Sequence, residues 1–190
     1  MDRRTALSRV AVILGGTIVG AEFFLTGCKP SDKNLGATLK FDAYDITFLD
    51  EVAETILPAT DTPGAKEAKV GEFMTVFVND CYDEKNQQIF LDGMKKINEA
   101  SKKKFNDNFM SISPEQRKEL LTEIDKERKT YTDNKKSEDP THYFVLIKQL
   151  TLLGYFSSEV GATKALRYVA IPGRYEGCIH YKKGDRAWAI

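Results

Sequence analysis

Three cysteines and two histidines carry the most versatile chemistry in this chain of 190 residues. Cysteine and histidine can hold zinc, and a cysteine or serine next to a histidine can act as a nucleophile. Zinc needs three or four ligands, and nothing in the spacing of Cys81, Cys178 and His180 supports such a site. A nucleophile also needs a base and a third group that orients the base, and nothing in the spacing of Cys81, Ser157 or Ser158 relative to the histidines supports this. The sequence therefore assigns no catalytic residue and no metal ligand.

Cys81 and Cys178 are the two cysteines that follow Cys28. In an oxidising compartment an isolated cysteine pair is a candidate disulfide. This bond would close a loop of nearly the whole domain, for which the chain-entropy argument gives about 4–5 kcal/mol. Two free thiols, or a bond from one thiol to another subunit, are the alternatives, and the sequence leaves all three open.

Neighbouring carboxylates could serve as a general acid and a general base. Asp50, Glu51 and Glu54 lie on the expected polar face of a helix, where a solvated surface explains them better than catalysis.

Sequence signatures of cofactor binding are missing as well. No Cys-x-x-Cys-His could attach haem, and no Gly-x-Gly-x-x-Gly follows a strand. We expect no cofactor in this chain.

The first 28 residues have the pattern of an export signal. Arg3 and Arg4 give a positive start, an apolar stretch runs from 11 to 27, and Leu-Thr-Gly-Cys at 25–28 resembles the lipobox of bacterial lipoproteins. We predict a signal peptide at 1–27 and a diacylglycerol on the sulfur of Cys28. A transmembrane anchor is the alternative, but a charge such as Glu22 costs about 2.5–3.5 kcal/mol in hydrocarbon.

The Arg3-Arg4 pair suggests the twin-arginine route, which exports folded proteins that often carry bound cofactors. Leu7 supplies the apolar position of that pattern, whereas Asp2 stands where Ser or Thr is usual. An arginine pair is also common in ordinary secretory signals. We predict export to the periplasmic or cell-surface side of a bacterial membrane.

Removal of residues 1–27 leaves 163 residues with 25 basic and 26 acidic side chains. That length suits one domain with a core of its own. The charge balance excludes an electrostatic footprint for nucleic acid.

Apolar residues at helical spacing predict an all-α domain of about five to six helices over 41–190, after a flexible tether at 28–40. Asp45 is the expected N-cap of the first helix, which ends before Pro58. Ser113, Pro114 and Gln116 mark another helix start. The expected helices cover 45–57, 70–82, 86–105, a segment from 114 to a charged link at 130–140, 141–156, and a short piece near 162–168.

The segment 141–156 is the most apolar part after the leader, and its apolar residues surround most of a helix. Such a helix is buried on several sides, either as the central core helix or against a partner. From Gly154 onward, five glycines with aromatic residues between them predict a loop-rich C-terminal segment.

Two sequence blocks resemble a known family. One is LDEVAETILPATDTPGA at 49–65, followed by VGEF at 70–73, and the other is KQLTLLGYFSSEVG at 148–161, followed by PGRY at 172–175. With these blocks in this order, the chain from about 48 to 181 resembles the small subunit (subunit 3) of gluconate 2-dehydrogenase.

The resemblance implies an accessory role. Such subunits accompany a large FAD-dependent flavoprotein of the glucose–methanol–choline type, which oxidises a sugar, sugar acid or other alcohol. Electrons then pass to a cytochrome c subunit or another membrane acceptor. The small subunit carries no flavin or haem and is thought to escort the large one through export, and the lipobox adds an anchor. The alternative is a stand-alone lipoprotein that binds a ligand or a surface partner.

The second block and its continuation are the expected partner contact. The residues concerned are Tyr155, Phe156, Ser158, Glu159, Pro172, Gly173 and Tyr175. The alternative is a structural turn in which Glu159 caps a nearby helix.

Overall fold

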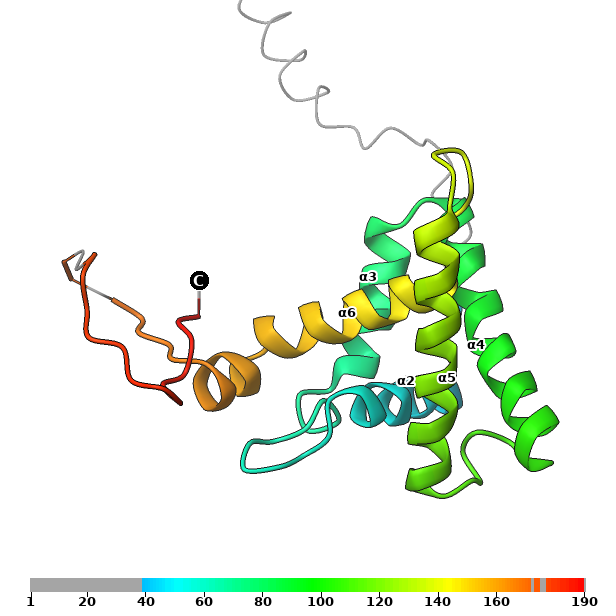
Figure 1. The fold of residues 1–190 in the computed structure, drawn as a ribbon, viewed down its shortest axis with the longest axis horizontal. Helices are drawn as coiled ribbons and strands as arrows, with labels where there is room; N and C mark the ends of the chain where they lie inside the picture. Colours follow the sequence, from blue (N-terminus) through cyan, green and yellow to red (C-terminus); the bar gives the residue numbers. More distant parts are fainter. Residues whose placement is uncertain (1–38, 172, 175–176, 190) are drawn as a thin grey trace, which may run out of the picture. The chain divides into compact units, whose positions relative to one another are not determined.

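The computed structural model of this chain describes residues 39–171, 173, 174 and 177–189. Within these residues the chain forms five α-helices, one π-helical turn and no β-strand, which confirms the expected all-α domain (Figure 1). The elements are α2 (Ala43–Ile56), α3 (Val70–Cys81), α4 (Glu84–Phe105), α5 (Pro114–Asn134), α6 (Tyr143–Ser157) and the π turn η1 (Gly161–Ala165). None of the described helices has both the length and the hydropathy that a membrane span needs. The predicted export residues Arg3 and Arg4 and the predicted lipid site Cys28 lie outside the described residues.

The N-cap of α2 lies three residues before the position that the sequence suggested. Asp42 is the N-cap, and its carboxylate accepts the backbone N–H of Asp45 at 2.8 Å. The Asp45 carboxylate in turn accepts the backbone N–H of Asp42 at 3.1 Å. The prediction that Asp45 is the N-cap was therefore wrong, because this reciprocal box places the second aspartate inside the first turn. The predicted end before Pro58 is confirmed.

Helix α5 starts as predicted, with a capping box between Ser113 and Gln116. It continues to Asn134, so the first part of the segment expected as a charged link is helical. The side chains of Thr130, Thr132 and Asn134 donate to carbonyl groups four residues earlier, at 2.8–3.1 Å. The hydrogen-bond donors of these polar side chains are paired with carbonyl groups of α5 itself, so the side chains do not end the helix.

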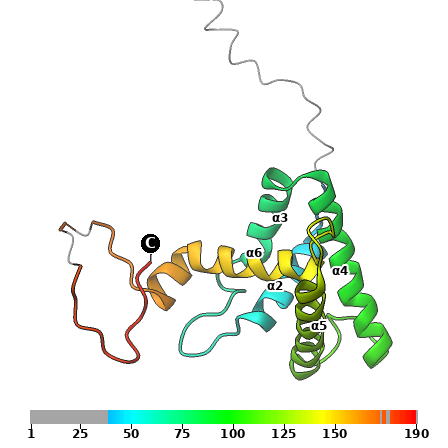
Figure 2. The ribbon, with the colours of Figure 1, turned by 45° about the horizontal axis from the view of Figure 1, so that its top comes forward.

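Helix α6 is the central helix of the domain. It contacts α2, α3, α4, α5 and η1, and it runs across the other helices in both views (Figure 1 and Figure 2). More than half of its residues are buried, including Phe144, Ile147 and Leu150. The interpretation of 141–156 as the core helix is thus confirmed. Leu153 and Phe156 remain exposed at its C-terminal end.

Candidate functional site

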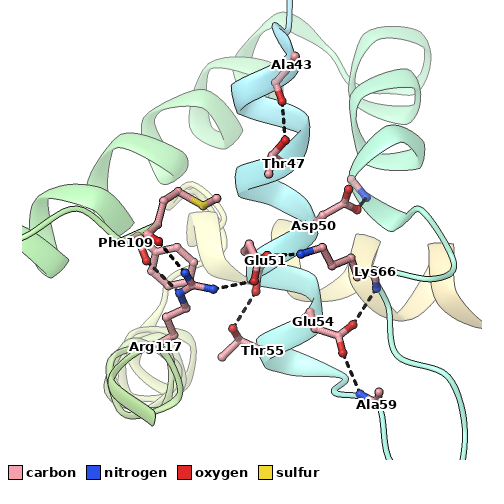
Figure 3. A network of polar contacts seen from close by, with 12 residues as sticks. Ala43, Thr47, Asp50, Glu51, Glu54, Thr55, Ala59, Lys66, Phe109 and Arg117 are labelled. Carbon is pink, nitrogen blue, oxygen red and sulfur yellow. Dashed lines mark hydrogen bonds and ion pairs between the residues drawn. The ribbon is translucent and has the colours of Figure 1, made fainter. Parts of the chain in front are cut away.

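The carboxylate of Glu54 on α2 holds the loop at 58–69, which we call the Pro/Gly loop. One oxygen accepts the backbone N–H of Ala59 at 2.9 Å, and the other accepts that of Lys66 at 2.8 Å (Figure 3). A Cβ atom on Gly64 would lie 2.3 Å from the same carboxylate. The loop can close on Glu54 because a glycine occupies this position.

Asp50, one helical turn before Glu54, caps the next helix. Its carboxylate accepts the backbone N–H of Gly71 at 2.8 Å, in the first turn of α3. The local N-cap residue, Lys69, has a left-handed backbone and makes no side-chain cap. Burial raises the pKa of Asp50, and the hydrogen bond from Gly71 opposes that rise. Asp50 of α2 therefore caps the N-terminus of α3 in place of a side chain from the local N-cap residue.

Glu51 joins the Pro/Gly loop to the N-terminal part of α5. It pairs with Lys66 from the loop and with Arg117, whose guanidinium lies 2.6 Å away. Arg117 also donates to the backbone carbonyls of Phe109 and Met110, at 3.0 and 2.7 Å (Figure 3). The interpretation of Asp50, Glu51 and Glu54 as a solvated face was wrong, because all three are half-buried and hold backbone or cationic partners.

Tyr155 on α6 connects the two sequence blocks described above. Its hydroxyl donates to the backbone carbonyl of Pro63 in the Pro/Gly loop at 2.6 Å, and its side chain is only 4% exposed. A Cβ atom on Gly154 would lie 2.6 Å from the ring of Phe73, so α6 and α3 approach closely here. The two blocks thus meet at Gly154 and Tyr155, and the hydrogen bond of Tyr155 fixes the Pro/Gly loop on the central helix.

The other expected partner contacts lie at the end of α6. Ser158 is half-buried, donates to the Tyr155 carbonyl at 2.7 Å and accepts the Gly161 N–H at 2.9 Å. Phe156 and Glu159 are exposed, and the Glu159 backbone carbonyl accepts a hydrogen bond from a threonine of η1. Gly173 is exposed with φ +71°. Pro172 and Tyr175 lie outside the described residues. Contact of this set with a partner stays a prediction.

We call residues 166–189 the C-terminal arm, and those of them that the structure describes belong to no helix or strand. Its two ends meet, because the Arg167 N–H donates to the Ala187 carbonyl at 2.7 Å and the Ala189 N–H to the Arg167 carbonyl at 2.9 Å. The Arg167 guanidinium lies 4.8 Å from the ring centre of Trp188. Arg186 donates to the carbonyl of Lys164 in η1 at 2.8 Å, so the base of the arm is attached to the helical domain.

A groove of about 480 Å³ lies between α4, α5 and the start of α6. Lys96, Glu127, Tyr131, His142 and Tyr143 are among its lining residues. His142 stacks on Tyr143 with ring centres 4.4 Å apart, and Tyr131 lies 5.4 Å from His142. Burial, with a smaller contribution from Glu127, raises the pKa of Tyr143 to about 12. The groove could accept a small polar ligand against its aromatic rings.

His142 predicts a pH dependence of stability. Its Nδ1 caps α6 by accepting the Phe144 N–H at 3.2 Å, which requires an unprotonated nitrogen. Burial lowers the pKa of His142 below its ordinary 6.5; Lys96 and Arg128 lower it further, and Glu127 opposes them. The contribution of neutral His142 is therefore complete above pH 6.5 and is lost as the pH falls from there through the folded-state pKa.

The measurement is urea unfolding at a series of pH values, for the unaltered chain and for His142→Asn. Asparagine keeps an N-cap oxygen but does not titrate. We expect the unaltered chain to lose stability relative to the variant as the pH falls from neutral to below 6.5. If the difference in the free energy of unfolding between the two chains stays constant over that pH range, this role of His142 is contradicted.

Both cysteines of the described part are exposed and free. Cys81 ends α3, and Cys178 lies in the C-terminal arm. The internal disulfide is not formed in this structure, and the pairing stays a prediction. Among the described residues, no three histidine, cysteine, aspartate or glutamate side chains are placed to hold a metal ion.

The family model of gluconate 2-dehydrogenase subunit 3 matches residues 43–173. The chain belongs to this family. A search of curated proteins and a search of solved structures found no match. Membership in the gluconate 2-dehydrogenase subunit 3 family makes the chain an accessory subunit of an oxidoreductase and implies association with the other subunits.

The subunit 3 match covers all five described helices and ends inside the C-terminal arm. The sequence pattern pointed to Tyr155, but it did not indicate the contact of Tyr155 with Pro63, the role of Arg117 or most of the arm. The arm had one visible signal, which was the succession of aromatic and basic residues between glycines. No local sequence signal pointed to Arg117, because its partner Glu51 is 66 residues away in the chain.

Proposed function

We propose that this chain is a non-catalytic, lipid-anchored small subunit of a membrane-associated dehydrogenase for sugars or sugar acids. Its partner is a large FAD-containing flavoprotein of the glucose–methanol–choline type, which passes electrons to a cytochrome c subunit or another membrane acceptor. The chain assists the export and maturation of the flavoprotein and attaches it to the membrane through Cys28. The family match over residues 43–173 carries this proposal.

The geometry of the carboxylates supports a non-catalytic role. Asp50, Glu51 and Glu54 lie within about one turn of α2, and each uses its oxygens to hold backbone N–H groups or cations. These carboxylates stabilise the fold instead of facing a substrate. The leader supports export in the folded state, since the twin-arginine route suits a partner that already holds its flavin.

The test follows the flavoprotein in cells that carry altered leaders. With Arg3→Lys and Arg4→Lys together, we expect both the chain and the flavin-dependent dehydrogenase activity to stay in the cytoplasm. The matched control is Arg9→Lys, which changes another leader arginine outside the pair and should leave export intact. With Cys28→Ser, the exported complex should move from the membrane fraction to the soluble fraction.

Co-purification from detergent-solubilised membranes completes the test. The unaltered chain should isolate with a larger protein that contains bound flavin. A chain that always isolates alone, together with normal flavoprotein export in its absence, would contradict the proposal.

A ligand-binding lipoprotein is the second candidate function, and the groove beside His142 favours it. Its aromatic rings and its charged rim, Lys96 and Glu127, suit a small polar molecule. That function predicts an exported chain without a flavoprotein partner. It also predicts a ligand that protects His142 and Tyr143 from chemical modification.

A further inference from the structure

The C-terminal arm leaves η1 and returns to it, as the orange to red segment of Figure 1 shows. The two backbone hydrogen bonds between Arg167 and the segment 187–189 close its base. Shortly before the chain returns to that base, a turn at Lys182–Asp185 is held by the Asp185 carboxylate, which accepts the Lys182 N–H at 2.9 Å. Irregular segments of this length are uncommon, and they are usually either functional or linkers.

The large exposed apolar side chains in the described part of the arm do not join the hydrophobic core of the domain. Among the described residues, the hydrophobic core and the side chains packed on it end at Ala165. Beyond that point, Tyr168 is 55% exposed, Ile171 85% and Tyr181 76%. Val169, Ile179 and Trp188 are exposed too. A concentration of large apolar side chains at the surface marks an interaction site.

The arm also differs in charge from the rest of the domain. Residues 166–189 contain five basic and two acidic side chains, a net charge of +3. Residues 39–165 contain 18 basic and 23 acidic side chains, a net charge of −5. The arm thus carries basic charge on an otherwise acidic domain, and it is suited to an acidic surface with apolar pockets.

A basic, aromatic segment could face either an acidic lipid surface or a protein. The arm is irregular, and a lipid interior cannot satisfy the backbone groups of an irregular chain. A protein surface can supply those hydrogen bonds, as in strand addition. Tyrosine, tryptophan and arginine are also the residues that dominate the binding energy of protein interfaces. These observations favour a protein.

We propose that the C-terminal arm is the docking element of this subunit, and that it binds an acidic, apolar surface of the large flavoprotein. Tyr168, Ile171 and Tyr181 enter apolar pockets of that surface, and Lys182 and Lys183 pair with its carboxylates. This inference rests on the function proposed above. It adds the surface through which the two subunits join.

The test compares variants of the full chain, produced in place of the natural one and purified from detergent-solubilised membranes. The arm variant combines Tyr168→Ser, Ile171→Ser and Tyr181→Ser. Its matched control combines Tyr44→Ser and Val76→Ser, which are 51% and 59% exposed on α2 and α3. We expect the flavin recovered with the arm variant to fall at least about tenfold, and the control to match the unaltered chain.

A second pair of variants tests the charge. Lys182→Glu with Lys183→Glu should lower flavin recovery by at least about threefold at low salt, because these changes reverse two charges of the arm. Lys102→Glu with Lys103→Glu makes the same change in the exposed last turn of α4 and should have no effect. Equal losses from both pairs would show a general effect of charge and would overturn the role of the arm.

Three further outcomes separate this inference from the proposed function. If the unaltered chain isolates without a flavoprotein, the proposed function fails and the arm inference fails with it. If the unaltered chain and the arm variant retain equal amounts of flavoprotein, only the arm inference fails.

Flotation with phosphatidylglycerol vesicles, measured on chains that also carry Cys28→Ser, tests the lipid alternative. Binding of vesicles that the arm variant loses while it keeps the flavoprotein would overturn the protein assignment.

Discussion

Replacement of Tyr155 by alanine is expected to destabilise the chain by about 3–5 kcal/mol, the range for removal of a buried aromatic side chain. The ring of Tyr155 is buried at the end of the central helix, and its hydroxyl holds Pro63 at 2.6 Å. Loss of this side chain opens a cavity and releases the Pro/Gly loop from α6. Urea unfolding of the isolated chain, followed by far-UV circular dichroism, measures the change.

Two companion variants separate the role of the ring from other roles. Tyr155→Phe keeps the ring and removes only the hydrogen bond to Pro63, so a loss of about 1 kcal/mol is expected. Phe156→Ala removes the neighbouring ring, which is 40% exposed, and should cost the isolated chain far less than Tyr155→Ala. If Tyr155→Ala leaves the isolated chain as stable as before, the side chain acts through a partner and not through the fold.

Replacement of Arg117 by methionine is expected to destabilise the chain by about 2–3 kcal/mol. The guanidinium side chain is 14% exposed and pairs with Glu51, which is 18% exposed. Methionine keeps the apolar stem of Arg117 but leaves the Phe109 and Met110 carbonyls without their donor. Hydrogen bonds to charged groups contribute about 1.5–3 kcal/mol each, and the remaining exposure of this pair reduces the total.

Lys104→Met is the matched control for that change. Lys104 also holds two ion pairs, with Glu119 and Glu123, but both of these carboxylates are more than half exposed. Exposed ion pairs contribute little to stability, so Lys104→Met should leave the urea midpoint almost unchanged. Equal midpoints for the Arg117 and Lys104 variants would show that the Glu51 network does not stabilise the fold.

The helices of this protein could be predicted from local sequence signals. Pro58 ended α2, and Ser113 with Gln116 began α5, because caps and prolines act within one turn of the chain. The same locality produced the errors. Asp42 and Asp45 are both good caps, and only the reciprocal hydrogen bonds of the folded turn distinguish them.

The family could also be recognised from the sequence, because its two blocks are continuous runs of residues. Their function in the fold could not be predicted. The first block looked like a polar helix face followed by a loop, and the second like a buried helix with a turn. The structure shows that Tyr155 of the second block holds Pro63 of the first. A hydrogen bond between residues 92 positions apart leaves no local pattern.

The sequence by itself determined the all-α class, most helix boundaries and the family, since each depends on residue types within a short stretch of chain. Only the tertiary structure decided that Glu51 and Glu54 bind the loop and Arg117, and that α6 lies at the centre. It alone also showed which apolar residues after Ala165 stay exposed. The physical reason is burial. Whether a side chain packs in the core, holds a loop by hydrogen bonds or stays exposed at the surface depends on the residues that pack around it.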